Sequence, residues 1–129
     1  MKNLLIIIPI FSFFCCTAQT PSKANVEKAV MTAWDKPATS SSPKQSVTIH
    51  SVKIGNGAKA NEQDKIDGIP AGATVTIAQI DFTVREYYND RTLATQRVMI
   101  AKVYKDQFDE WAVKSNGMKT VETKSEPAN

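Results

Sequence analysis

The chain has 129 residues, of which 42% are hydrophobic and 22% are charged, with a formal net charge of +3. This composition is typical of an ordinary globular protein. The basic residues are dispersed and form no run like those of nucleic-acid binders, so we expect no nucleic-acid partner.

The first residues have the pattern of a secretory signal peptide. A short positive start, Met1-Lys2-Asn3, precedes an apolar block from Leu4 to Phe14. This block is shorter than the roughly 20 apolar residues that a membrane span needs. We therefore expect a signal peptide over residues 1–18, cleaved after Ala18, and export of the remaining chain, residues 19–129, as one domain in the periplasm or outside the cell.

Both cysteines of the chain, Cys15 and Cys16, lie at the end of this segment. Cleavage after Ala18 removes both of them. In the alternative, Cys15 or Cys16 is acylated and the protein is a lipoprotein, which is the only case in which we expect a membrane contact. Either way the folded part has no internal disulfide, so packing alone must hold the fold.

The first expected element is a helix that ends before Pro37. Ser22 or Asn25 can cap its start by accepting a hydrogen bond from a free backbone N–H. Its apolar residues recur with the period of one helix face: Val26, Ala29, Val30, Ala33 and Trp34.

The next stretch alternates between loops and one strand. Residues 36–46 hold two prolines and four serines, which predicts a loop. Residues 46–54 favour a strand, with a switch of the apolar face near His50-Ser51 that predicts a β-bulge. The polar residues 55–72 predict a long mobile loop, which Ile66 and Ile69 pin to the surface.

Three further strands are predicted in the second half of the chain. Residues 73–88 form the clearest one, with a second switch of face at Ala78-Gln79. Residues 92–105 return after the turn at Asn89-Asp90, and residues 108–113 form a shorter strand. A polar, flexible tail follows from about residue 116 and frays after Val121.

One helix followed by consecutive antiparallel strands predicts the α+β class. We expect the N-terminal helix to pack on the concave face of a curved antiparallel sheet of about four strands. The expected core brings helix and sheet residues together: Val26, Val30, Trp34, Ile80, Phe82, Val84, Val98 and Ile100.

The order of these elements, over most of residues 23–115, resembles that of cystatin-like and nuclear-transport-factor-2-like rolls, a form of many small exported bacterial proteins. Cystatins insert a Q-x-V-x-G hairpin into cysteine proteases. Here the segment from Gln45 to Ile49 matches the Gln and the Val but has Ile49 in the place of the glycine. The resemblance carries over the architecture and no functional residue.

Residues with the chemistry of catalysis or metal binding are few. His50, the only histidine, and Asp81 are candidate bases, but we favour the simpler interpretations, a surface or hydrogen-bonded core histidine and a solvent-facing strand carboxylate. One histidine does not make a zinc site. The acidic segment 61–68 lacks the spacing and the closing Glu of a calcium loop. We assign no catalytic residue, no metal site and no cofactor.

Aromatic side chains offer the best functional lead. We expect them to gather where three strands and their turns meet, either as cross-strand packing or as a binding surface. The candidate binding residues are Tyr87, Tyr88, Tyr104, Phe108 and Trp111.

Three hypotheses for function follow. The first is an exported, non-enzymatic binding or interaction domain for a protein or a small molecule. The second is a small cavity enzyme of the nuclear-transport-factor-2-like kind, with Asp81 or His50 as base in an enclosed polar pocket between helix and sheet. The third is a cell-envelope structural protein held by lipid on Cys15 or Cys16.

Overall fold

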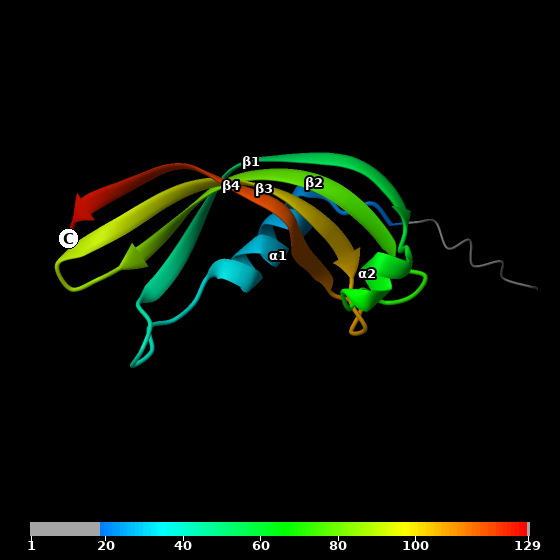
Figure 1. Ribbon diagram of the computed structural model, residues 1–129, viewed down its shortest axis with the longest axis horizontal. Helices are drawn as coiled ribbons and strands as arrows, with labels where there is room; N and C mark the ends of the chain where they lie inside the picture. The colour runs from blue at the N-terminus through cyan, green and yellow to red at the C-terminus, as the bar shows by residue number, and fades with distance from the viewer. Residues whose placement is uncertain (1–18, 129) are drawn as a thin grey trace, which may run out of the picture.

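The structure, a computed structural model, describes residues 19–128. Helix α1 (Lys23–Trp34) is followed by strand β1 (Lys44–Lys59), the short helix α2 (Glu62–Ile66) and three strands, β2 (Thr74–Tyr87), β3 (Arg91–Lys105) and β4 (Trp111–Pro127). The strands form one antiparallel sheet in the order β1-β2-β3-β4, which arches over α1 (Figure 1). The predicted α+β class, with one N-terminal helix on a curved sheet, is confirmed. The predicted signal peptide, with Cys15 and Cys16, lies outside the described residues.

Helix α1 begins and ends where local chemistry predicts. Ser22 is the N-cap, and its hydroxyl accepts a hydrogen bond from the backbone N–H of Asn25 at 3.1 Å. The side chain of Asn25 accepts in return from the N–H of Ser22, which completes a capping box. The buried face of the helix consists of Val26, Ala29 and Val30, with Trp34 half-buried at its end.

The core lies between α1 and the concave face of the sheet, which we call the inner face. Phe82, Ile80 and Val26 are completely buried there, and the ring of Trp34 lies 5.7 Å from that of Phe82. The β3 residues of the core differ from the prediction. They are Met99, Ala101 and Val103, whereas Val98 is half-buried and Ile100 is 36% exposed.

The register between β2 and β3 explains this correction. Ile80 pairs with Met99, and Ala78 pairs with Ala101. Residues directly opposite each other in neighbouring strands point to the same face of a sheet. The β-branched Val98 and Ile100 therefore lie on the convex face, which we call the outer face.

The bulge predicted near His50-Ser51 is confirmed, and the one predicted at Ala78-Gln79 is wrong. The pairing of β1 with β2 slips between Ile49 and Ser51, which leaves His50 as the extra residue. A second slip lies in β1 between Ile54 and Gly57, while β2 pairs with β3 without interruption. The extra residues belong to β1 because it is an edge strand with one neighbour, whereas β2 must match a strand on each side.

The predicted mobile loop over residues 55–72 is largely wrong. Strand β1 continues to Lys59, and the capping box of Asn61 and Asp64 starts α2 two residues later. Ile69 is 2% exposed, so it packs against the rest of the protein as predicted. Ile66 is 78% exposed, so the same prediction is wrong for this residue. The loop predicted over residues 36–46 is also shorter than expected, since β1 begins at Lys44.

Strand β4 replaces both the short predicted strand 108–113 and the predicted flexible tail. It pairs with β3 from Lys105↔Trp111 to Arg91↔Pro127. Its side chains from residue 115 onward are exposed, because only the backbone of this edge strand is held. A strand of this kind has no alternation of apolar and polar residues, so its sequence resembles that of a tail.

Candidate functional site

The aromatic candidates do not gather at one place, which corrects the sequence prediction. Tyr87 ends β2 and pairs with Thr92 at the start of β3, and Tyr88 follows in the turn. Tyr104 lies about 12 residues further along β3, roughly 40 Å for an extended strand. Phe108 and Trp111 follow it in the next turn and at the start of β4. Successive turns of an antiparallel sheet lie at opposite ends, so the five residues form two separate groups.

The β3–β4 turn is tightly held by Asp106. Its carboxylate accepts hydrogen bonds from the backbone N–H groups of Phe108 at 2.8 Å and Glu110 at 3.0 Å. Its own N–H donates to the carbonyl of Glu110, and its carbonyl accepts from the N–H of Asp109. Asp109 has a φ of 60°, in the left-handed region that side chains other than glycine rarely adopt. These bonds fix the turn and leave the Phe108 side chain 74% exposed.

A cleft of about 310 Å³ lies between this turn and α1. Trp111 is half-buried at the cleft, and the ammonium of Lys105 lies 5.3 Å from the centre of its ring. Lys105 also pairs with the carboxylate of Asp109 at 3.3 Å. The cleft is lined on one side by a stripe of α1 and on the other by the turn: Asn25, Lys28, Ala29, Thr32, Asp109, Glu110 and Trp111.

Tyr104 lies on the outer face near the same turn. It pairs with Ala112 and alternates with the core residue Val103 along β3. Burial, and to a smaller extent the carboxylate of Asp106, raise the pKa of its hydroxyl above the ordinary value of 10.0. The phenol is therefore neutral at physiological pH and remains able to donate a hydrogen bond.

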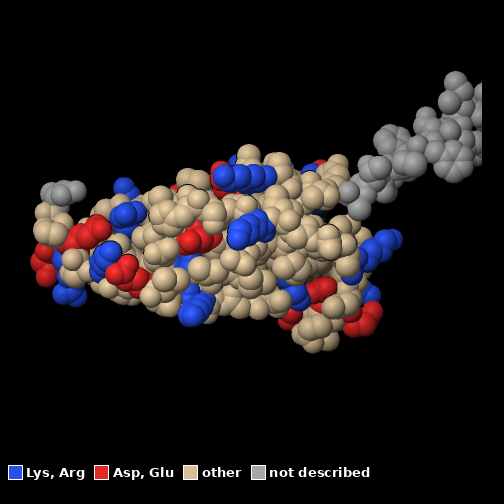
Figure 2. Space-filling view, turned by 90° about the horizontal axis from the view of Figure 1, so that it is seen from above, with Lys and Arg blue, Asp and Glu red and all other residues tan. Residues whose placement is uncertain are grey.

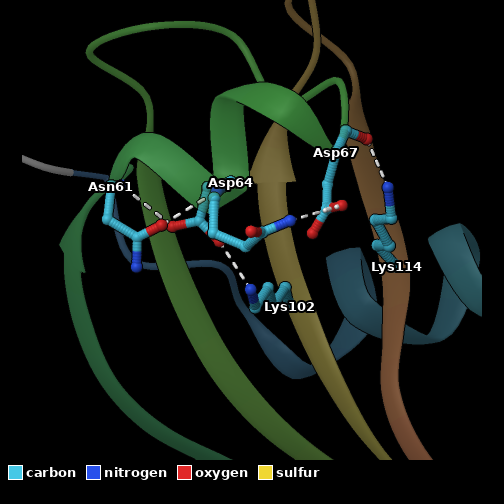
Figure 3. Close-up of polar contacts among 6 residues, drawn as sticks. Asn61, Asp64, Asp67, Lys102 and Lys114 are labelled. Atoms are coloured by element: carbon cyan, nitrogen blue, oxygen red, sulfur yellow. Dashed lines mark hydrogen bonds and ion pairs between the residues drawn. The ribbon is translucent and has the colours of Figure 1, made fainter.

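Helix α2 is fastened to the outer face by polar contacts (Figure 3). Lys102 lies between the core residues Ala101 and Val103, so its side chain points away from α1 and toward α2. Its ammonium donates to the buried carboxylate of Asp64 at 2.5 Å. The ammonium of Lys114 donates to the backbone carbonyl of Asp67. Sequence reasoning missed this pair of lysines, because only the strand register places them opposite the acidic segment.

The acidic residues of segment 61–68 are thus bound by donors of the protein itself. Asp64 accepts from Lys102 and from the N–H of Asn61, and Glu62 pairs with Lys65 at 2.6 Å. Asp67 accepts from the side-chain amide of Gln63. Within residues 19–128 no three side chains of the metal-ligating types come together. The segment caps one end of the outer face.

The Asp64–Lys102 pair predicts how the attachment of α2 depends on pH. The hydrogen bond from Lys102, followed by that from the Asn61 N–H, lowers the pKa of Asp64 below its ordinary value of 3.8, against the opposing effect of burial. Because the folded-state pKa is the lower one, the stabilisation is complete above about pH 4 and is lost as the pH falls through the folded-state pKa.

We expect hydrogen exchange at the backbone N–H of Ile69, which is bonded to the carbonyl of Asp64, to accelerate below about pH 4 relative to the intrinsic rate. Asp64→Asn should accelerate the exchange already at pH 7 and abolish this pH dependence. Glu62→Gln is the matched control, because the Glu62 side chain is 88% exposed. An unchanged exchange rate in Asp64→Asn would show that the pair does not hold α2.

His50 and Asp81 lie on the outer face, away from α1. The Nε2 atom of His50 lies 2.7 Å from the hydroxyl of Thr83, and Asp81 accepts a hydrogen bond from the side-chain amide of Gln96 at 3.1 Å. Asp81 alternates with the core residues Ile80 and Phe82, which is the solvent-facing placement expected from strand alternation. The two candidate bases therefore do not point into the space between α1 and the sheet.

That space is filled by apolar side chains. Its large fully buried apolar residues come from α1, β2 and β3: Val26, Val30, Ile80, Phe82, Met99 and Val103. One buried threonine, Thr76, pairs with Val103 at the β3–β4-turn end of the sheet. The segment from Gln45 to Ile49, which resembles the cystatin motif in part, is also not a hairpin turn. It pairs with β2 along its whole length, from Gln45↔Glu86 to Ile49↔Phe82.

Comparisons with known proteins return no match of any kind: no family model, no curated protein and no solved structure is significantly similar to the chain. Among residues 19–128, neither α1 nor α2 is long and apolar enough to cross a membrane. Any function must therefore be argued from the residues themselves.

Proposed function

We propose that the protein is an exported, non-enzymatic interaction domain that contacts a protein partner through its β3–β4 turn. The observation that carries this proposal is Phe108, an aromatic side chain 74% exposed on a turn that the hydrogen bonds of Asp106 hold in one conformation. Isolated exposed aromatics have little structural purpose, whereas buried aromatic anchors dominate the energetics of protein interfaces.

The surroundings of Phe108 suit an anchor of this kind. A rigid turn loses little conformational entropy on binding, which leaves more of the contact energy as affinity. The cleft lined by Trp111 lies directly beside the turn and offers a concave surface for a side chain of the partner. Helix α2, fastened to the start of β4 through Asp67 and Lys114, adds the exposed Ile66 at the same end of the molecule. Ile66 lies on the outer face of the sheet, whereas the exposed Phe108 and the cleft on the α1 side form a contact surface with a charged rim at the turn itself.

The sequence patterns support the remaining parts of the proposal. Residues 1–18 have the pattern of an export signal, and the order of one helix and four antiparallel strands is compatible with a cystatin-like or nuclear-transport-factor-2-like roll used here for binding. The enzyme hypothesis has less support, because His50 and Asp81 lie on the outer face and apolar side chains fill the space between α1 and the sheet. The lipoprotein hypothesis depends on whether Cys15 or Cys16 is retained.

Site-specific crosslinking tests this function. A photoreactive benzoylphenylalanine at position 108, expressed in the native host, should form a crosslink to one defined protein. The matched control places the same group at Tyr87, which is 41% exposed at the other end of the sheet. Phe108→Ala in the otherwise native chain should weaken co-purification of that partner by at least about tenfold, the loss expected for an interface anchor. The intact mass of the recovered protein reports export, since cleavage after Ala18 leaves Gln19 as the first residue.

Two results would contradict the proposal. One is equal crosslinking from positions 108 and 87 to the same set of proteins, which indicates random encounters. The other is a partner whose co-purification is unchanged by Phe108→Ala.

A further inference from the structure

A polar hollow of about 210 Å³ lies on the outer face of the sheet, toward the end opposite to the β3–β4 turn. All four strands contribute to its wall or floor, and its lining contains the only histidine of the chain. The lining residues are His50, Thr83, Arg85, Ala94, Gln96, Glu122, Lys124 and Glu126.

Small residues form the floor of the hollow. Thr83 is 8% exposed and Ala94 is 7% exposed, although both lie on the outer face and not in the core under α1. Thr83 pairs with Gln96, and Ala94 pairs with Arg85, so each small residue has a longer polar neighbour beside it. Short side chains surrounded by long ones leave room for a ligand, and the hydroxyl of Thr83 gives the floor a polar atom.

Two β-bulges lie beside the hollow, one in each edge strand of the sheet. His50 is the extra residue of the first, in β1, and Val121 is the extra residue of the second, in β4, where the pairing slips between Gln96 and Arg97. Bulges re-aim the side chain of the extra residue and occur often beside functional sites. Here the first bulge turns His50 toward the floor, so that its Nε2 atom reaches the Thr83 hydroxyl at 2.7 Å.

The charges around the hollow cancel. Arg85 lies 3.9 Å from the carboxylate of Glu126, and Lys124 lies 3.2 Å from that of Glu122. Figure 2 shows basic and acidic side chains intermingled over this end of the molecule, without a patch of either sign. Two cations and two carboxylates give a ligand of either charge no net attraction. They do offer hydrogen-bond donors and acceptors side by side, and exposed ion pairs are weak enough to exchange partners with a ligand.

We propose that this hollow binds one hexose-sized sugar unit. A sugar is neutral and carries adjacent hydroxyl groups that each donate and accept, which matches the alternation of ammonium, guanidinium, carboxylate, amide and imidazole around the floor. A hollow of about 210 Å³ has room for several ordered waters, which one pyranose ring displaces. The 41% exposed ring of Tyr87, two residues from Arg85 on the same face, offers an apolar platform for the next unit of an oligosaccharide.

The experiment is a titration of the purified protein with glucose, galactose, mannose and N-acetylglucosamine, followed by backbone amide chemical shifts. The expected result is saturable shifts at Thr83, Ala94 and Gln96 with at least one sugar, and a dissociation constant of about 1 mM, which is typical of a single small polar ligand. His50→Ala should weaken this binding by at least about tenfold, because it removes the imidazole from the wall.

Lys53→Ala is the matched control, since Lys53 is an exposed β1 residue outside the hollow. The proposal is overturned if none of the four sugars shifts these amides at about 20 mM, well above the expected dissociation constant. It is also overturned if His50→Ala and Lys53→Ala bind equally well, or if acetate or ammonium ions saturate the site more tightly than the sugars. None of these outcomes depends on Phe108 or on a protein partner, so this inference and the proposed function fail independently.

Discussion

Phe82→Ala lowers the free energy of unfolding by about 3–5 kcal/mol, the usual cost of removing a fully buried aromatic ring. Phe82 is completely buried between α1 and the sheet, and its ring packs against Trp34 at 5.7 Å between centres. Its deletion leaves a cavity in the layer that joins α1 to the sheet. Denaturant unfolding followed by circular dichroism measures the loss.

Phe108→Ala provides the matched control, because the same atoms are removed from a side chain that is 74% exposed. Its free energy of unfolding should stay within about 0.5 kcal/mol of the wild type. The difference between the two variants separates a core residue from a surface residue kept for contact. Equal losses in both variants would mean that the placement of one of the two rings is wrong.

Val30→Asp should prevent folding at pH 7 or lower the free energy of unfolding by at least about 4 kcal/mol, because it buries a charged carboxylate. The Asp side chain is close in size to Val, so the loss reports the charge and not a change of volume. Val30 is completely buried on the face of α1 that packs on the sheet. The residues packed around Val30 in this core are apolar, and the cation at this face, Arg97, lies over the ring of Trp34, one turn further along α1. A domain of this size has only about 5–15 kcal/mol of stability in total, so the loss is readily detected by thermal unfolding.

The matched control is Val121→Asp, at the bulge residue of β4 that is 53% exposed. This variant should unfold within a few degrees of the wild type, because the new carboxylate remains in water. Lowering the pH toward the pKa of an ordinary carboxyl group should partly restore the stability of Val30→Asp, because burying the neutral acid costs less free energy than burying the carboxylate. Normal stability of Val30→Asp at pH 7 would contradict the packing of α1 on the sheet.

Local chemistry in the sequence was sufficient for α1, β3 and the first bulge. The capping residues Ser22 and Asn25 and the apolar stripe of α1 all lie within residues 22–34, and nothing distant alters them. The switch of apolar face at His50 likewise has one local solution, an extra residue that returns Val52 and Ile54 to the inner face beside Ile49.

The inner residues of β3 were not predictable in the same way. Both faces of β3 carry apolar residues in the sequence, Val98 and Ile100 on one and Met99 and Ala101 on the other. Either face is therefore compatible with a core. The choice is made by the register with β2, which sets Met99 opposite Ile80. The division of the aromatic candidates into two groups has the same origin, because the antiparallel order sends Tyr87 and Tyr104 to opposite ends of the sheet.

The fold class, the single long helix and its caps follow from residues that are neighbours in the chain, so the amino-acid pattern alone predicts them. Three features emerge only once the sheet is assembled: residues 111–127 form an edge strand, Lys102 and Lys114 hold α2, and His50, Thr83 and Arg85 share a hollow with β4. All three depend on backbone pairing between strands that are distant in sequence. A polar edge strand and a lysine opposite a carboxylate leave no periodic pattern in their own segments.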